Sequence, residues 1–306
     1  MYNVVIGIPS FRRPLMLKKL IFSITGCNID RSLIKDVIIL VVDNDIEKTA
    51  EITVKELADE FYGIHRFYYH NYPVKGLSNV RNEIFTKALE FNPDYIACID
   101  DDEYVTSDWL NQLLLTITKS RAEIVLGPVI PEFEGKVSPY IAYWFKYQKL
   151  ENFQKVHFFW TGNFVISADF FLKHKIEFDN RFNITGSEDS YFGVKALKSG
   201  ADICWANKAV AYETIPQKRA NLKWLIRRNF NNAITFTYIL KLEKIYFSLL
   251  KKTLISITYS VTGVIALVFI PFPFRWKYWG ILKISESIGG FAGLFSFQFH
   301  EYAKDR

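Results

Sequence analysis

Apolar runs of strand length alternate with segments of helical period along the first 210 residues, and this alternation limits the folds open to the chain. The strand-like runs occupy residues 3–9, 36–43, 64–69 and 94–99. Between them, apolar residues recur with a helical period over residues 13–24, 46–60 and 78–90. Strands that alternate with helices in this way predict an α/β fold, with a doubly wound sheet flanked by helices.

The same alternation continues less regularly to residue 240. Further helices are expected over residues 107–118, 188–199 and 221–240. Further strands are expected over residues 123–129, 157–166, 201–205 and 209–213. Prolines predict a loop-rich passage over residues 128–139. Ser78 is a candidate N-cap, Gly200 is expected just beyond a helix end, and Leu15 shares a helical period with Leu17 and Leu20.

The C-terminal segment has a different composition. Between Lys252 and Arg275 lie 22 residues without a charge, which as a helix would cross about 30 Å of hydrocarbon. A second apolar stretch, residues 284–299, is interrupted by Glu286. Two full spans would place Arg275 and Lys277 outside the cytosol, against the positive-inside tendency. We therefore expect a re-entrant or in-plane helical pair in the cytoplasmic leaflet. A two-span hairpin, or a buried pair in a soluble domain or dimer interface, is the alternative.

Charge is distributed unevenly along the chain. Residues 215–306 carry 14 Lys and Arg against 4 Asp and Glu, whereas residues 1–214 have a balance of −4. A basic end favours an anionic partner, and the adjacent apolar runs favour lipid over nucleic acid. We expect a catalytic domain at 1–214 and a membrane-association region at 215–306. The three cysteines form no metal-ligand spacing and are expected to be reduced.

The strongest chemical signal is the run Asp100, Asp101, Asp102 and Glu103, directly after an apolar strand. In an open α/β sheet, ligands bind beyond the carboxyl ends of the strands. Clustered carboxylates repel one another, and a hard divalent cation carrying phosphate oxygens relieves that repulsion. The run therefore favours Mg²⁺ or Mn²⁺ with a nucleotide diphosphate. A solvated acidic turn is the alternative.

Three further positions carry weaker signals. Asp43 ends another buried strand, where it could accept a hydrogen bond from a base or ribose or simply form a turn. Glu188 and Asp189 begin a helix, as a general base or as caps favoured by the helix dipole. Arg81 lies in a first helical turn, where the dipole disfavours a cation, so we expect it to serve an anion or another acid.

Taken in order, these motifs resemble those of family 2 inverting glycosyltransferases, which have a GT-A fold with a mixed sheet. They are IGIPSFRRP, VVDND, GLSNVRN, IDDDE, TGNF and GSEDSYF, and the resemblance covers about residues 1–240. The stretch VAYETIP and the basic helix after it are similar to the succinoglycan-type glucosyltransferase branch, which acts on polyprenyl-diphosphate-linked sugars.

The resemblance implies a role for each matching residue. Asp43 would contact the nucleobase, Asp100 the ribose, and Asp102 a metal that bridges the diphosphate. Asp189 would be the general base, and Glu188 would hold the acceptor or position Asp189. The other donor-site residues would be Pro9, Arg12, Arg81 and Asp101. Glu213 stands where many members have a histidine, so either Glu213 would be a metal ligand in its place or the site would have no third protein ligand. Acceptor contacts would come from Trp160, Gly162, Asn163 and Arg219.

The resulting hypothesis is an inverting hexosyltransferase at the cytoplasmic face of a bacterial inner membrane. It would move a sugar from a nucleotide-diphospho-sugar, UDP-linked by expectation, to a polyprenyl-diphosphate-linked glycan, with Mn²⁺ or Mg²⁺ and no nucleic-acid partner. Residues 1–105 would bind the nucleotide and residues 106–214 the acceptor. One alternative is a metal-dependent nucleotidyltransferase or phosphohydrolase that uses Asp100–Asp102. Another is a non-catalytic binding module.

Overall fold

The computed structural model describes residues 1–183, 185–268 and 274–295. Its strands are β1 (Tyr2–Ser10), β2 (Ile34–Asp43), β3 (Arg66–Asn71), β4 (Tyr95–Ile99), β5 (Glu103–Val105), β6 (Ile124–Leu126), β7 (Val129–Phe133), β8 (Asn163–Ser167), β9 (Ile203–Trp205) and β10 (Ala211–Ile215). Its α-helices are α1 (Pro14–Thr25), α2 (Glu51–Glu60), α3 (Leu77–Leu89), α4 (Trp109–Ser120), α5 (Pro139–Ala142), α6 (Ala168–His174), α7 (Glu188–Lys198), α8 (Leu222–Leu242), α9 (Tyr246–Val268) and α10 (Phe274–Leu294). Short 3₁₀ turns span Tyr143–Phe145 and Asn180–Phe182.

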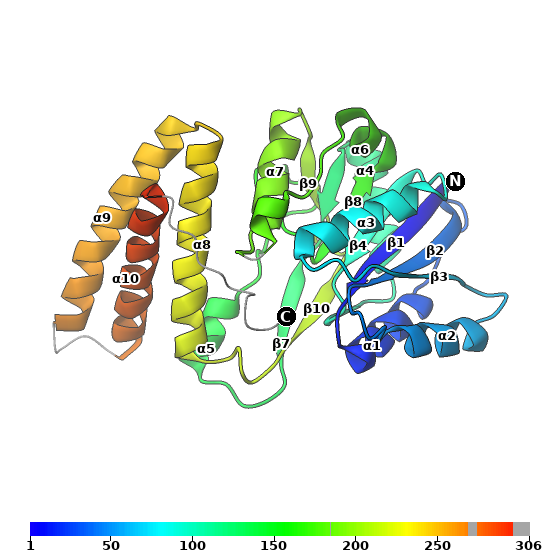
Figure 1. Ribbon diagram of the computed structural model, residues 1–306, viewed down its shortest axis with the longest axis horizontal. Helices are drawn as coiled ribbons and strands as arrows, with labels where there is room; N and C mark the ends of the chain where they lie inside the picture. Colours follow the sequence, from blue (N-terminus) through cyan, green and yellow to red (C-terminus); the bar gives the residue numbers. More distant parts are fainter. Residues whose placement is uncertain (184, 269–273, 296–306) are drawn as a thin grey trace. The chain divides into compact units, whose positions relative to one another are not determined.

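The main sheet has seven strands in the order β3-β2-β1-β4-β8-β6-β9 (Figure 1). Strands β1 to β4 are parallel to one another, and β8 runs antiparallel to both β4 and β6. The chain moves from β1 outward to β2 and β3, then returns to the other side of β1 as β4. The predicted doubly wound mixed sheet is therefore confirmed.

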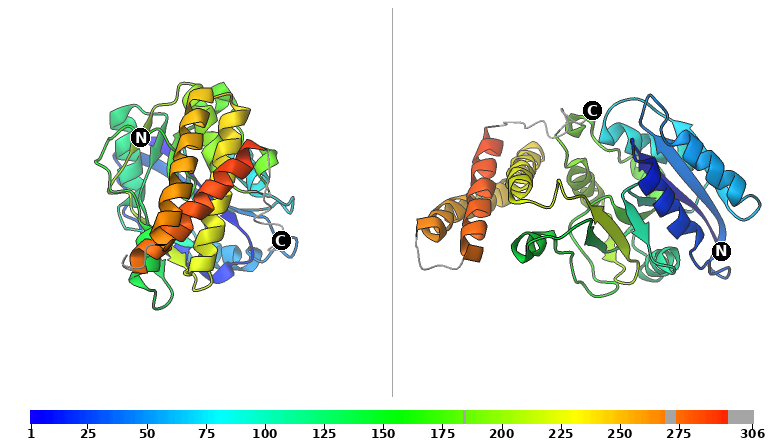
Figure 2. Two further views of the ribbon diagram at one scale, coloured as in Figure 1. Left: turned by 90° about the vertical axis from the view of Figure 1, so that its left-hand side faces the viewer. Right: turned by 90° about the horizontal axis from the view of Figure 1, so that it is seen from below.

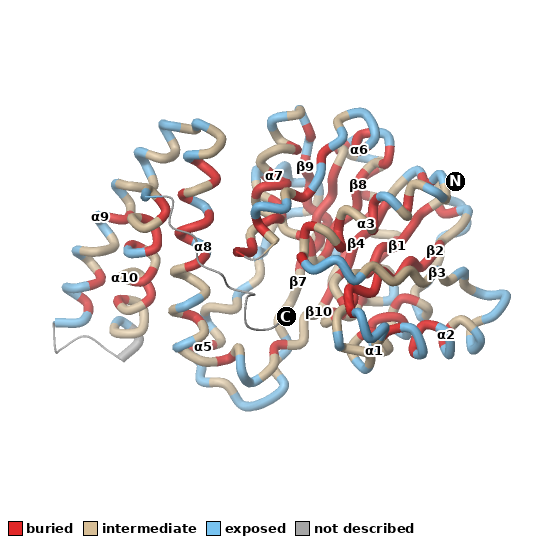
Figure 3. The backbone as a smooth tube through the Cα atoms, in the orientation of Figure 1, coloured by how far each residue is buried: buried red, intermediate tan, exposed pale blue. Residues whose placement is uncertain are grey.

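The strands at the centre of this sheet are largely buried (Figure 3), and two hydrophobic cores cover its two faces. Val4, Ile6 and Ile8 of β1 pack in the core that α1, α2 and α4 complete. Val5 between them joins the core that α3, α6 and α7 complete. Successive strand residues point to opposite faces, so both faces need apolar residues, and β1 and β2 are apolar throughout their centres.

A second, three-stranded sheet has the order β5-β10-β7. β5 and β10 are antiparallel, with Glu103 opposite Glu213 and Tyr104 opposite Tyr212. The backbone N–H of Thr214 donates to the carbonyl of Asp102 at 3.0 Å. This small sheet therefore holds the chain that follows the acidic run.

The chain divides into two compact units. The first consists of residues 1–132, 147–183 and 188–214, and the second of residues 133–146, 184–187 and 215–306. In the second unit, α10 packs against both α8 and α9 and crosses them at an angle (Figure 2, left). Asn221 caps α8 by accepting from the Trp224 N–H at 3.0 Å.

Several predicted boundaries are wrong, for local reasons. Residues 157–162 are not a strand. The aromatic residues that suggested one are explained by packing instead, since Phe159 contacts Phe164 and Phe192. The loop predicted at 128–139 contains β7. Helix α2 begins at Glu51, five residues after the predicted start. Leu15 is 82 % exposed, because the core face of α1 is formed by Leu17, Leu20, Ile21 and Ile24.

Close approach of α3 to β1 requires a glycine at position 7. A Cβ on Gly7 would lie 2.2 Å from the side chain of Ile84. We expect Gly7→Ala to lower the free energy of unfolding by about 1–3 kcal/mol through overpacking. Urea titration measures this loss. Gly26→Ala is the control, because a Cβ there meets its nearest atom at 3.3 Å; equal losses in the two variants would contradict the prediction.

Candidate active site

The site lies at the carboxyl edge of the parallel strands. Ser10 at the end of β1 is level with Asp43 at the end of β2, and the acidic run follows β4 on the other side of β1. Strands are added on one side of β1 up to β3 and on its other side from β4, so the strand order reverses between β1 and β4, which is where open α/β sheets bind ligands. The fold thus gathers the segments at 10–13, 43–45 and 100–103 at one edge.

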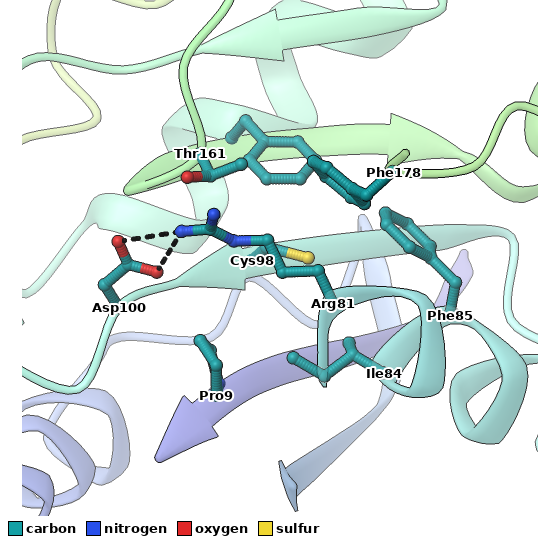
Figure 4. A pocket seen from close by; sticks show the side chains of 9 residues that line it. Pro9, Arg81, Ile84, Phe85, Cys98, Asp100, Thr161 and Phe178 are labelled. Carbon is teal, nitrogen blue, oxygen red and sulfur yellow. Dashed lines mark hydrogen bonds and ion pairs between the residues drawn. The ribbon is translucent and has the colours of Figure 1, made fainter. Parts of the chain in front are cut away.

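Arg81 is the central residue of the site. Its guanidinium contacts Asp100 at 3.3 Å and also forms an ion pair with Glu188. Figure 4 shows Arg81 reaching across to Asp100, in a pocket lined by Pro9, Thr161 and several aromatic rings. Burial opposes the charge on Arg81, but Asp100, Glu188 and Asp189 outweigh burial and raise its pKa. The expectation that Arg81 serves another acid is confirmed.

The start of α3 explains how Arg81 is held. Ser78 is not the N-cap; Gly76 occupies that position, and the side chain of Asn183 accepts from the N–H groups of Ser78 (2.9 Å) and Asn79 (3.3 Å). Gly76 has φ +132°, and a Cβ there would lie 2.2 Å from the Asn183 oxygen. A residue more than 100 positions away therefore caps the helix that carries Arg81, which no local sequence pattern indicates.

Glu188 and Asp189 begin α7 and lie in different environments. Glu188 is buried, and burial raises its pKa to about 7 against the opposing effect of Arg81. Asp189 is only half-buried. Ser187 before them has φ +67°, a conformation that non-glycine residues seldom adopt and that is often found at functional sites. The more accessible acid of the pair is thus the one predicted to act as the base.

Arg13 is a site residue that the sequence did not indicate. One guanidinium nitrogen lies 2.8 Å from an Asp101 oxygen and 2.9 Å from an Asp102 oxygen. The Phe11 N–H donates to the other Asp101 oxygen at 3.1 Å. Burial raises the pKa of Asp101 to about 7, and the charge of Arg13 opposes that shift. Arg12, which the family motif indicated, points to Asp45 instead and is 55 % exposed.

Asp43, which is predicted to contact the nucleobase, has a structural role in the loop that follows β2. Its carboxylate accepts from the N–H groups of Asp45 (3.0 Å) and Ala50 (2.9 Å) and from the Tyr69 hydroxyl (3.1 Å). These bonds hold the 44–50 loop at the end of β2 and explain the late start of α2. Contact with a nucleobase stays a prediction.

Glu103 ends the acidic run that the sequence favours as a metal and nucleotide site, although no individual role was expected for it. It is buried, and burial together with Asp100, Asp102 and Glu213 raises its pKa well above the usual range. A Cβ on residue 162 would lie 2.3 Å from Oε1 of Glu103, so the glycine at this position leaves room for the Glu103 side chain. Its Oε2 is buried without a hydrogen-bond partner among the described residues.

The predicted acceptor residues are placed as follows. Trp160 is half-buried and stacks on Phe158 with ring centroids 4.8 Å apart. Asn163 is fully buried. Its side-chain oxygen accepts a hydrogen bond from the Trp109 ring N–H (2.8 Å), and its side-chain NH₂ donates to the carbonyls of Pro128 (3.0 Å) and Ala209 (2.7 Å). Asn163 therefore has a structural role, and its sugar contact stays a prediction. Arg219 belongs to the second unit.

The acids suit a hard cation that is shared with a phosphate. All candidate donors are carboxylates, the type that Mg²⁺ and Mn²⁺ prefer. Within the described residues, no group of three potential ligands is positioned to hold a metal alone. Mg²⁺ is commonly bound through one or two carboxylates plus substrate phosphates. The orphaned Glu103 oxygen and the neighbouring aspartates fit that arrangement.

Comparison with known proteins identifies the class. The Glycosyl transferase family 2 domain matches residues 5–174, and the Glycosyl transferase family group 2 domain matches residues 95–286. The chain therefore belongs to glycosyltransferase family 2. It is 28 % identical over 243 residues to the succinoglycan biosynthesis protein ExoM of Rhizobium meliloti (strain 1021), covering 76 % of this chain and 74 % of that one.

Solved structures share the fold. S. aureus TarS 1–349 in complex with UDP-GlcNAc has a TM-score of 0.55 at 13 % identity, covering 98 % of this chain and 93 % of that one. The chain spans 55 % of the longer TarS structure. GalNAc-T7 with UDP, GalNAc and Mn²⁺ has a TM-score of 0.56 at 14 % identity, covering 79 % of this chain and 48 % of that one.

Removing Arg81 should destabilise the protein in a pH-dependent manner. Arg81→Met leaves Glu188 and Asp100 without their cation, and breaking a buried pair costs about 3–5 kcal/mol. The pKa of Glu188, already raised to about 7, should rise further. An acid with a raised folded-state pKa loses stability as pH increases, so the deficit should be larger at about pH 8 than at about pH 5.

Urea titrations of both proteins at the two pH values measure the deficit. Lys87→Met, which removes the ion-pair partner of the exposed Glu90, is the control. A deficit for Arg81→Met that is constant with pH, or that grows at low pH, would contradict the prediction.

Proposed function

We propose that the protein is a membrane-associated inverting glycosyltransferase that uses a nucleotide-diphospho-sugar and a lipid-linked glycan acceptor. The observation that carries the proposal is the arrangement around Arg81. The guanidinium joins Asp100, at the predicted donor-binding edge, to Glu188, which precedes the half-exposed Asp189. Donor and base sites would thus be linked by one buried cation.

Asp189 is the proposed general base. It would take the proton of the acceptor hydroxyl while the hydroxyl oxygen attacks the anomeric carbon, and the bond from that carbon to the diphosphate would break. Attack from the opposite face inverts the anomeric configuration. Glu188 would fix the first turn of α7 through Arg81 and so hold Asp189 in position.

The donor would occupy the carboxyl edge of β1, β2 and β4. Asp43 would contact the nucleobase, Asp100 the ribose, and Pro9 and Arg12 the remainder of the nucleotide. Asp102, with Asp101, Glu103 and Glu213 nearby in sequence or sheet register, would hold a divalent cation. When bound, Mn²⁺ or Mg²⁺ would neutralise the charge that develops on the leaving diphosphate. The solved structures of TarS with UDP-GlcNAc and of GalNAc-T7 with UDP, GalNAc and Mn²⁺ support this choice of donor.

Packing in the second unit supports membrane association. Glycine and serine lie between the helices: Gly263 faces Gly280, and the hydroxyls of Ser285 and Ser287 donate to carbonyls of α8 and α9. Large apolar side chains instead lie on the exposed face of α9, at the positions Phe247, Leu250, Leu254, Ile257, Val261, Val264 and Val268. Small residues between helices and large apolar residues outside are typical of helices in lipid. By length and composition α9 could cross a membrane.

The test of catalysis is release of nucleoside diphosphate from UDP-, GDP-, dTDP- and CMP-sugars, with the full chain in mild detergent and a lipid-linked acceptor. We expect release from one donor in Mn²⁺ or Mg²⁺ and its loss in EDTA. Asp189→Asn should lower turnover by at least about 10²-fold, the usual contribution of a general base, while nucleotide affinity by calorimetry is retained.

Asp59→Asn, on the exposed end of α2, is the matched control for the loss of one carboxylate. Near-normal turnover of Asp189→Asn would refute the assignment of the base. Release of pyrophosphate or free phosphate, in place of nucleoside diphosphate, would instead identify a nucleotidyltransferase or phosphohydrolase.

The exposed face of α9 provides a separate test of membrane association. We expect Leu254→Glu combined with Val261→Glu to reduce vesicle binding at least tenfold, because a charge in hydrocarbon costs about 2–3 kcal/mol. Flotation with phosphatidylcholine vesicles measures binding. Ile52→Glu, at a 72 % exposed position on α2, is the control. Equal binding by the double variant and the control would rule out α9 as the lipid contact.

A further inference from the structure

A cluster of charged side chains lies between α9 and α10, within a largely apolar pair of helices whose other charged residues lie at 251, 275 and 277. The Lys252 ammonium lies 2.9 Å from one oxygen of Glu286, and the Lys283 ammonium lies 2.8 Å from the other. The two lysine side chains are only 12 % and 16 % exposed. Lys283 also lies over the ring of Tyr259, 4.1 Å from its centroid. Two helices thus direct two cations to one carboxylate.

The cluster carries an excess positive charge. Glu286 is the single acidic residue in the sequence from 246 to 294, so one negative charge faces two positive ones. A neutral ion pair would need only one lysine. Charges within apolar helices are costly, and where they occur they usually mark a ligand or ion site.

Both ammonium groups retain donor capacity. An ammonium has three N–H bonds. Lys252 donates one to Glu286, and Lys283 donates to Glu286 and is also hydrogen-bonded with Tyr259, so each lysine keeps at least one N–H beyond these contacts. Gly290, one turn beyond Glu286, faces Ser256, where a Cβ would lie 2.3 Å from the serine oxygen and 3.9 Å from the Lys252 stem. The absence of a side chain at position 290 therefore lets α9 and its lysine approach α10 closely.

We propose that Lys252 and Lys283 form a binding site for the phosphate of a lipid headgroup, with Glu286 holding the two lysines when no lipid is bound. The site rests on the proposed membrane association, because a lipid phosphate reaches it only if the helices are in contact with a bilayer. Phosphate oxygens match two converging ammonium groups in charge, and such charge-assisted hydrogen bonds are among the strongest in proteins. The lipid could be an anionic phospholipid or the polyprenyl diphosphate of the acceptor.

The test compares binding of the full-length protein to three kinds of vesicle: phosphatidylcholine alone, with phosphatidylglycerol, or with polyprenyl diphosphate. Lys251→Gln is the matched control, since Lys251 is the exposed neighbour of Lys252 and its loss removes the same charge. A lysine near an anionic surface contributes about 1 kcal/mol, or roughly fivefold, without any specific site. We expect Lys252→Gln and Lys283→Gln each to lower the preference for phosphate-bearing vesicles at least tenfold. Glu286→Gln should raise it, because it removes the competing carboxylate.

Circular dichroism checks folding of each variant, and Lys252→Arg, which keeps the charge, should keep the preference. The vesicle type that shows the effect identifies the lipid. Equal effects of Lys251→Gln and Lys252→Gln, or an unchanged or lower preference for Glu286→Gln, would overturn the proposal. Failure of the wild type to bind any vesicle would refute membrane association itself. A wild type that transfers sugar and binds all three kinds of vesicle equally would refute only the lipid site.

Discussion

The buried ion-pair network of Arg81 connects the parts of the first unit on which the site depends. Its guanidinium would be unstable in the interior without Asp100 and Glu188, and the two carboxylates would repel each other without it. The network needs α3, β4 and α7 in register, and Asn183 fixes the start of α3. Correct placement of Asp189 is therefore a result of folding the whole unit, and not of the local sequence around it.

Much of the architecture could be predicted because buried positions give the sequence a regular pattern of apolar residues. The strands of a sheet covered on both faces are continuously apolar, as at 36–43, and helices with one buried face repeat every three to four residues, as at 78–90. The same logic failed at 157–162, where apolar residues are buried without being a strand. It also failed at β7, a short strand whose pairing is with distant β10.

The candidate site, too, could be predicted from the sequence only in part. Asp100 and Arg81 were found because each breaks a local expectation: a run of acids after a strand, and a cation at a helix start. Arg13 and Asn183 break none, because their significance comes from contacts with Asp101 and Ser78, which lie 88 and 105 positions away. Glu103 belongs to the acidic run, but its burial beside Gly162 and opposite Glu213 depends on distant residues. Arg12 and Arg13 are equivalent in sequence terms, and only the direction of the backbone before Pro14 decides which one reaches Asp101.

The contact of Arg13 with Asp101 and Asp102 has a consequence for the newly made protein. The chain supplies its own neutralising charge at the acid cluster, so the carboxylates can come together before any metal ion or nucleotide arrives. Folding of the acid cluster is thereby separated from binding of the proposed metal. For the proposed metal-dependent reaction, scarcity of the ion would bear on how fast each finished molecule works, and not on how many molecules reach their folded state.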